Sequence, residues 1–319
     1  MARPASSRPS PFVTLAAAVA LSGAPLFCAH AMTIQATFGS AITGASNATQ
    51  IENTINSALG FYDNTITNNI RVKIAFDGGL SGTDLGKSNT GAYSVSYSGY
   101  YNDLSQSSTS ATDATALANL SSIDPFGSGG TVAVNPANAL ALGIVPHIKG
   151  SAGSVNLNLD ALNFPGNSGS YDATTAIQHE VDEVLGLGSI MAPGVSTPSG
   201  VVRPEDLFRY DAHGNRSLTK SSTASAYFSL NGTTDLAQFN QTGTGDYGDW
   251  LTNCGDPRVQ DAGVCANTQV SLNRSSVEAT ALDAIGYTLT PVPLPASGAL
   301  MFSGLVGLLG WRGRRRRAA

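Results

Sequence analysis

Apolar residues recur along the chain with two different periods. Spacings of three and four residues predict amphipathic helices, and they occur at residues 50–67, 113–120, 136–142, 171–187 and 277–285. Alternation of apolar and polar residues predicts half-buried strands, and it occurs at residues 70–76, 93–97 and 154–159. This mixed order of helices and strands favours an α+β fold with a mixed sheet. Because residues 32–290 contain no internal repeat and no evident boundary, we expect them to form a single domain.

The N-terminus has the three parts of a secretory signal. Residues 1–31 combine a basic start, an apolar run and an Ala-His-Ala cleavage pattern at 29–31, which together predict a signal peptide. A lipoprotein acylated at Cys28 is the weaker alternative, because the bulky Phe27 stands where a small residue is expected.

The C-terminus, residues 291–319, also has three parts: a Pro-rich motif at 292–296, an apolar stretch at 297–311 and an arginine cluster. The stretch is short for a permanent span, which needs about 20 residues, and the arginines favour a cytoplasmic C-terminus. This order resembles the PEP-CTERM class of sorting signals in its VPLPA form. The resemblance implies transient insertion into the inner membrane, processing by an exosortase-like enzyme, and export through the periplasm to the surface or medium of a Gram-negative bacterium. A plain tail anchor is the alternative.

Composition agrees with export and excludes one class of partner. Only 12% of the residues are charged, about half the usual share. Seven of the 17 basic residues lie in the first ten and last eight positions, which leaves ten in the body against all 22 acidic residues. Because so acidic a body repels phosphate backbones, we expect no nucleic-acid partner. In an oxidising compartment Cys254 and Cys265 are expected to form a disulfide.

The predicted helix at 171–187 carries residues that can bind a metal ion. Asp172 suits its N-cap and Gly186 its end. His179 and Glu183 lie four residues apart, so their side chains leave the same side of the helix and can converge on one ion. Glu180 is rotated by about 100°, so it can accept a proton from a water that the ion polarises. We therefore predict one catalytic Zn²⁺ held by His179 and Glu183, with Glu180 as the general base.

This helix resembles the active-site helix of zincin metalloproteases. Their motif is His-Glu-x-x-His, and Glu183 stands here in place of the second His. Gly186 matches the glycine of metzincins, Ser189 stands where they have a third His, and residues 189–193 resemble their Met-turn. Further segments resemble a group of secreted bacterial metalloproteases that have an HExxE helix and a PEP-CTERM tail, namely 204–210, 227–232 and 245–250.

The resemblance implies a zincin-like domain that hydrolyses protein or peptide substrates. A carboxylate in place of an imidazole adds negative charge, which makes the zinc a weaker Lewis acid and predicts slower turnover. The third ligand is left open by the sequence. Asp206 and His213 are the candidates favoured by ligand type, and Glu205 and His147 are further alternatives.

Other interpretations remain open. Glu180, Asp182 and Glu183 would also suit the solvent face of an ordinary amphipathic helix. Asp246 and Asp249 lie among glycines, but their spacing fits no EF-hand, so an acidic turn is favoured over a Ca²⁺ loop. The alternatives to a peptidase are a non-catalytic cell-surface or matrix protein that retains the zincin scaffold, and an exported polysaccharide-binding module.

Overall fold

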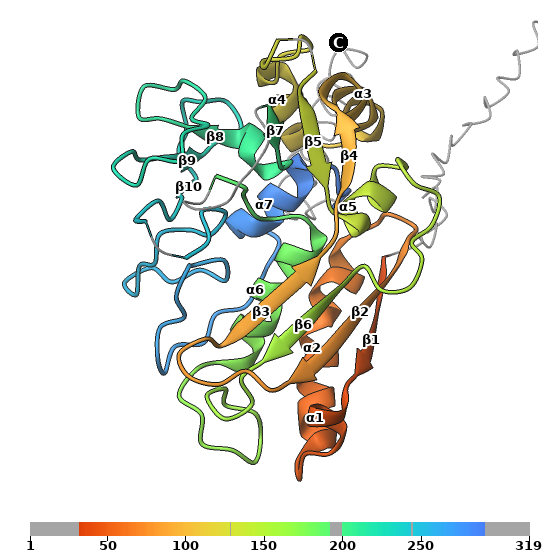
Figure 1. Ribbon diagram of the computed structural model, residues 1–319, viewed down its shortest axis with the longest axis vertical. Helices are drawn as coiled ribbons and strands as arrows, with labels where there is room; N and C mark the ends of the chain where they lie inside the picture. Colours follow the sequence, from red (N-terminus) through yellow and green to blue (C-terminus); the bar gives the residue numbers. More distant parts are fainter. Residues whose placement is uncertain (1–31, 128, 192–199, 244, 291–319) are drawn as a thin grey trace, which may run out of the picture.

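The computed structural model describes residues 32–127, 129–191, 200–243 and 245–290 (Figure 1). Within these residues the chain is an α+β protein with seven α-helices and three small sheets. The predicted signal peptide at 1–31 and the predicted sorting tail at 291–319 lie outside the described residues. None of the helices in the described ranges is both long and apolar enough to cross a membrane.

The largest sheet has four strands in the order β1-β2-β6-β3. Three of them run parallel, namely β1 (Thr33–Phe38), β2 (Arg71–Gly78) and β6 (Gly153–Leu157). The edge strand β3 (Gly86–Thr90) pairs antiparallel with β6. Along β2 the side chains of Val72, Ile74 and Phe76 are buried while Arg71 and Lys73 are exposed, which is the period of two that a sheet with one buried face requires.

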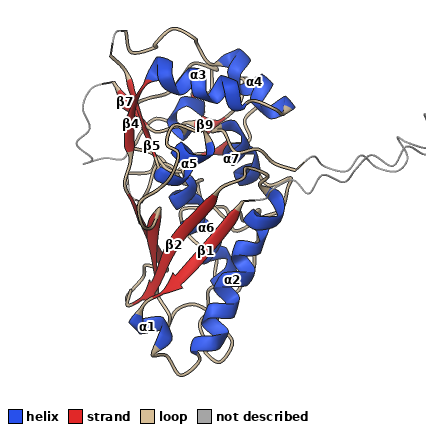
Figure 2. Ribbon diagram, turned by 90° about the vertical axis from the view of Figure 1, so that its right-hand side faces the viewer, coloured by secondary structure: helices blue, strands red, loops and turns tan. Residues whose placement is uncertain are grey.

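Two helices cover the buried face of this sheet (Figure 2). Helix α2 (Ala48–Thr65) packs on β1, and helix α6 (Ala173–Leu185) packs on β3, β6 and α2. The Tyr62 hydroxyl of α2 lies 2.9 Å from both the Gln178 carbonyl oxygen and a carboxylate oxygen of Asp182. The Gln178 amide in turn donates to the Ala58 carbonyl at 3.1 Å. Apolar packing and this buried network fix α6 against α2.

The rest of the described chain consists of short elements joined by long loops. The second sheet contains β4 (Tyr93–Ser96), β5 (Thr131–Val134) and β7 (Val201–Val202), and the third contains β8 (Arg209–Tyr210), β9 (Tyr227–Phe228) and β10 (Ala237–Gln238). The remaining helices are α1 (Ser40–Thr43), α3 (Tyr97–Ser107), α4 (Ala111–Asn119), α5 (Pro136–Ala141), the 3₁₀ helix η1 (Glu205–Phe208) and α7 (Val277–Ala284).

Every helix and strand predicted from periodicity is present, with ends that differ by at most two residues. The predicted disulfide between Cys254 and Cys265 is also confirmed, with the two Cα atoms 5.7 Å apart. The elements that periodicity did not indicate include β1, β3, α3 and β5. Of these, β3 matters most, because it forms one wall of a pocket beside α6.

Candidate metal centre

Helix α6 has the two ends that its sequence predicts. The Asp172 side chain accepts a hydrogen bond from the Thr175 backbone N–H at 2.8 Å, which caps the N-terminus. At the other end the Gly186 N–H donates to the Asp182 carbonyl at 2.9 Å. Gly186 has a φ of 132°, a conformation that favours glycine and ends the helix. The register of the side chains along α6 is therefore fixed from both ends.

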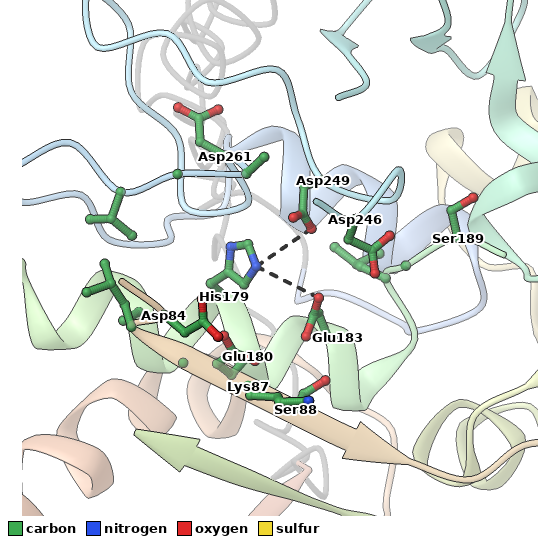
Figure 3. A pocket seen from close by; sticks show the side chains of 18 of the residues that line it. Asp84, Lys87, Ser88, His179, Glu180, Glu183, Ser189, Asp246, Asp249 and Asp261 are labelled. Carbon is green, nitrogen blue, oxygen red and sulfur yellow. Dashed lines mark ion pairs between the residues drawn. The ribbon is translucent and has the colours of Figure 1, made fainter. Parts of the chain in front are cut away.

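This register brings His179, Glu180 and Glu183 to one pocket (Figure 3). One potential ligand atom from each residue lies within 4.8 Å of the other two. His179 Nε2 is 3.8 Å from Glu183 Oε1. The pocket has a volume of about 610 Å³ and is lined on one side by β3. The two predicted ligands, His179 and Glu183, and the predicted base, Glu180, thus lie in the same pocket.

A further carboxylate reaches the same imidazole from a distant part of the chain. Asp249 Oδ1 lies 3.6 Å from His179 Nε2 (Figure 3), and Asp246 and Asp261 line the same pocket. A Cβ on Gly248 would lie 2.3 Å from the Gly188 Cα, so the loop backbone packs directly on the turn that follows α6. The local sequence around Asp249 favours only an acidic turn, because nothing in it signals this approach.

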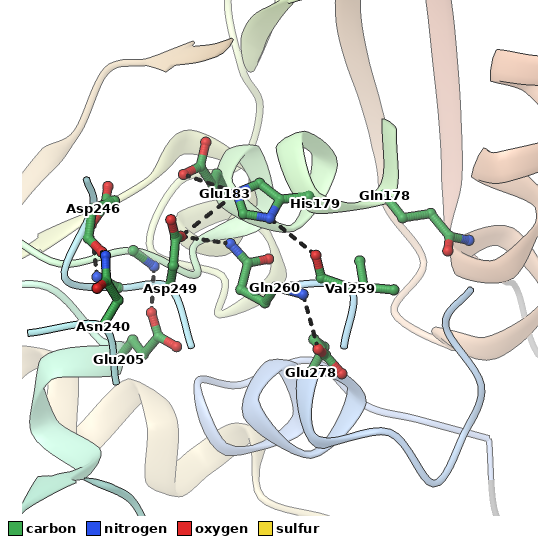
Figure 4. Close-up of polar contacts among 12 residues, drawn as sticks. Gln178, His179, Glu183, Glu205, Asn240, Asp246, Asp249, Val259, Gln260 and Glu278 are labelled. Atoms are coloured by element: carbon green, nitrogen blue, oxygen red, sulfur yellow. Dashed lines mark hydrogen bonds and ion pairs between the residues drawn. The ribbon is translucent and has the colours of Figure 1, made fainter. Parts of the chain in front are cut away.

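The orientation of the His179 ring is set by a backbone carbonyl (Figure 4). His179 Nδ1 lies 3.0 Å from the Val259 carbonyl oxygen. A carbonyl only accepts hydrogen bonds, so Nδ1 carries a proton and the neutral ring has its lone pair on Nε2. This is the arrangement in which metal-binding histidines are usually held. The lone pair therefore lies on the nitrogen nearest Glu183 and Asp249.

Glu180 is buried between α6 and the edge strand. Its side chain is only 6% exposed, and its Oε2 has no hydrogen-bond partner among the described residues. A Cβ on Gly86 would lie 2.3 Å from Glu180 Oε1, so the β3 backbone packs against the carboxylate. Asp182 is 0% exposed and contacts Tyr62 at the back of the helix. The interpretation of these acids as a solvent face is therefore wrong.

Burial and like charges raise the pKa values of Glu180 and Asp249 in the pocket. For Glu180 the cause is burial and then Glu183, and for Asp249 it is burial and then Asp246. Burial lowers the pKa of His179, but the nearby Glu183 and Glu180 outweigh it, so the net shift is upward. Repulsion among buried carboxylates is relieved when a cation binds between them. The electrostatics of the pocket therefore favour a bound cation.

The third-ligand candidates from the sequence are placed elsewhere. Asp206 is buried in η1, where its carboxylate accepts hydrogen bonds from the Ser189 hydroxyl and, at 2.9 Å, from the Arg203 N–H. His213 lies in an exposed turn, and its backbone N–H donates to Asp211 at 2.8 Å. Neither Asp206 nor His213 lines the pocket, so the structure does not bring them to His179 and Glu183.

The two remaining alternatives are also outside the pocket lining. Glu205 is fully buried beneath the turn after α6, where it accepts a hydrogen bond from the Gly188 N–H. His147 is exposed and lines a separate surface pocket beside Tyr93. Met191 of the predicted Met-turn is buried, whereas residues 192 and 193 of that turn lie outside the described residues.

Comparison with known proteins adds no relative to this picture. No protein-family model, no curated protein and no solved structure matches the chain. The zincin-like assignment therefore stays a prediction.

Proposed function

We propose that this protein is an exported zinc-dependent metallopeptidase with one zincin-like domain over residues 32–290. The observation that supports this most is the His179 ring, whose Nδ1 bonds to the Val259 carbonyl at 3.0 Å while its Nε2 lies near Glu183 and Asp249. Glu180 offers a carboxylate oxygen within 4.8 Å of ligand atoms of His179 and Glu183, and its Oε2 has no hydrogen-bond partner in the described part of the chain. Together these residues supply a metal ligand pair and an adjacent base.

The distances suit a zinc ion. Zinc lies about 2.0 to 2.2 Å from nitrogen and oxygen ligands, so two ligands of one tetrahedral ion are about 3.3 to 3.6 Å apart. The 3.8 Å between His179 Nε2 and Glu183 Oε1 is longer than a hydrogen bond but close to this separation. His179 and Glu183 would hold the ion, and a small rotation of the Glu183 side chain would bring its oxygen to ligand distance.

When bound, zinc would act as a Lewis acid that polarises a peptide carbonyl and makes water more acidic. Glu180 would accept the proton of the attacking water at Oε2 and then donate it to the departing amine. Burial of Glu180 behind β3 keeps its carboxylate away from bulk solvent. Attack by water breaks the C–N bond, and the products are a carboxylic acid and an amine.

A peptide substrate is favoured by the edge strand β3. Its one pairing partner in the described sheet is β6, so its other side has backbone groups without a strand partner. Residues 86–88 and Thr90 of this strand line the pocket beside Glu180. An extended peptide can pair with such an edge as an added strand. This would run the peptide backbone along the pocket and past the proposed metal site.

Export is supported by the two end signals of the sequence and by the disulfide between Cys254 and Cys265. Such a bond persists in an oxidising compartment such as the periplasm or the cell exterior. The tail would be processed by an exosortase-like enzyme after transient insertion of residues 297–311 into the inner membrane.

The test combines metal content with proteolysis of an unfolded protein such as reduced casein. We expect one zinc per chain, and in Glu180→Gln we expect the same zinc content with cleavage slowed by about 10²- to 10⁴-fold. The control is Asp84→Asn, an exposed carboxylate on the pocket rim, which should retain cleavage. Zinc without cleavage in the unmodified protein would favour the non-catalytic alternative, and absence of zinc binding would refute the metal site.

A further inference from the structure

We propose that Asp249 is the third protein ligand of the metal, which completes a set of one imidazole and two carboxylates with His179 and Glu183. This inference rests on the proposed zinc site and names the ligand that the sequence could not supply. It also ties the helix to a loop remote in sequence, which has no metal-binding motif of its own.

The first support is the geometry around His179 Nε2. Asp249 Oδ1 lies 3.6 Å and Glu183 Oε1 lies 3.8 Å from this same nitrogen (Figure 3). Both separations are too long for hydrogen bonds. Both are close to the distance of about 3.3 to 3.6 Å between two ligand atoms of a tetrahedral zinc ion. Two carboxylates thus reach the unprotonated nitrogen at ligand-to-ligand distance.

The second support is the rigid mounting of Asp249 (Figure 4). Its side chain is 5% exposed, and Gln260 Nε2 donates to its Oδ1 at 3.2 Å. Gln260 is itself 0% exposed, and its backbone N–H donates to Glu278 Oε1 at 3.0 Å. Metal-binding carboxylates are commonly oriented by such partners. Gln260 is therefore a positioning residue for Asp249.

The third support is the unpartnered Glu180 Oε2, which is independent of the loop. This oxygen is buried and has no partner in the described ranges, and one carboxylate oxygen of Glu180 lies within 4.8 Å of ligand atoms of His179 and Glu183. A buried carboxylate oxygen without a donor calls for a bound water or ion beside it. It therefore indicates that the centre of this group binds something.

The other acids of the pocket are engaged in their own loops. Asp246 accepts a hydrogen bond from the Gly248 N–H at 2.7 Å, within its own turn. Asp261 accepts from the Arg258 N–H at 3.1 Å, which closes the next turn. These carboxylates contribute negative potential to the pocket, whereas Asp249 is the loop residue that pairs with the imidazole.

The test measures zinc affinity of the metal-free protein by competition with a chromophoric chelator. Loss of partners of metal ligands costs about 10- to 100-fold in affinity, so loss of a ligand in Asp249→Asn should weaken zinc binding by about 100-fold or more. Gln260→Leu should weaken it by about 10- to 100-fold. Asp246→Asn, the matched control from the same loop, should stay within about fivefold of the unmodified protein because it removes only a nearby charge.

A second, spectroscopic test detects ligation of the metal directly, and so does not depend on a loss of zinc affinity. A thiolate that ligates Co²⁺ gives a near-ultraviolet charge-transfer band, so Asp249→Cys loaded with Co²⁺ should show this band and Asp246→Cys should not. A band from Asp246→Cys alone, or unchanged zinc affinity in Asp249→Asn, would overturn the assignment. The proposed function would survive that result, whereas it would fail if the unmodified protein bound no zinc. Circular dichroism of each metal-free variant checks that it is folded.

Discussion

The two sides of the pocket are built in different ways. On one side, His179, Glu180 and Glu183 lie within two turns of a capped α-helix. On the other side, Asp246 and Asp249 lie in a long connection between β10 and α7. Its described residues contain isolated bridges in place of strands, such as Phe239 with Trp250 and Trp250 with Asp261. The helix side is positioned by local geometry, and the loop side by contacts with distant residues.

The loop side owes its shape to an aromatic core rather than to a backbone ladder. Trp250, next to Asp249, is buried against Phe228 and Phe239 with ring centroids 5.5 and 5.0 Å away. Its indole N–H donates to Glu278 Oε1 at 3.1 Å. A substitution on the helix side should therefore change chemistry at an intact site, whereas one beneath the loop should move the site itself.

The largest effect is expected from removing the aromatic support of the loop. Trp250→Ala should lower the free energy of unfolding by about 3 to 5 kcal/mol, because it leaves a large cavity and removes the donor to Glu278. Urea unfolding measures this change. Zinc affinity should fall as well, since Asp249 is the adjacent residue. A variant that lost stability but kept full zinc affinity would show that the loop side does not hold the ion.

An intermediate effect is expected from crowding the base on the helix side. In Gly86→Ala the new Cβ would lie 2.3 Å from Glu180 Oε1, so the carboxylate must move. A displacement of about 1 Å can reduce catalysis by about 100-fold, and zinc affinity should be nearly unchanged because Glu180 is not a proposed ligand. Steady-state proteolysis and chelator competition separate the two quantities.

The control for this variant is Gly91→Ala, one residue beyond the same strand, where a Cβ meets nothing within 4 Å. This change should leave proteolysis at the level of the unmodified protein. Equal losses at both positions would mean that strand flexibility, rather than contact with Glu180, limits the rate.

The smallest effect is a pH dependence from the loop side. Burial raises the pKa of Asp261 from 3.8 to about 6. The folded protein therefore binds more protons than the unfolded chain between about pH 4 and 6, so this group's contribution to stability is lost as pH rises through that window. Asp261 is only 3% exposed, but it lines the open pocket, where solvent screening limits the change to about 1 kcal/mol.

The Asp261→Asn variant should lack this pH dependence of stability. The free energy of unfolding of the variant, relative to that of the unmodified protein, should therefore increase between about pH 4 and 7. Urea unfolding of both metal-free proteins at the two pH values checks the sign. A difference that is independent of pH would indicate that Asp261 titrates normally.

The contrast between the two sides also explains what the sequence could predict. Helices α2 and α6 and strand β2 were predicted because each buries one periodic face, as Ile51, Ile55 and Tyr62 do in α2. Strand β3 has the sequence Gly-Lys-Ser-Asn-Thr, without an apolar residue. Its pairing with β6 and its contact with α6 make it a strand. Neither contact produces an apolar periodicity in the sequence of the strand.

The site divides in the same way. His179, Glu180 and Glu183 could be predicted because helical spacing alone brings them together. Asp206 was chosen by ligand type, which does not reveal that Ser189 and Arg203 already engage its carboxylate. Asp249 could not be predicted, because its place depends on the close approach of Gly248 to Gly188 and on the support of Gln260.

The His179 ring has one consequence for the stability of the protein. Its two nitrogens face different parts of the same connection, Nδ1 toward the Val259 carbonyl and Nε2 toward Asp249. An ion at Nε2 would link α6 to this connection. Because the ion binds the folded state, its binding free energy would add to the stability of that state. If the ion binds as proposed, the metal-loaded protein should resist added proteases better than the metal-free protein, because the ion adds one more link between the connection and α6.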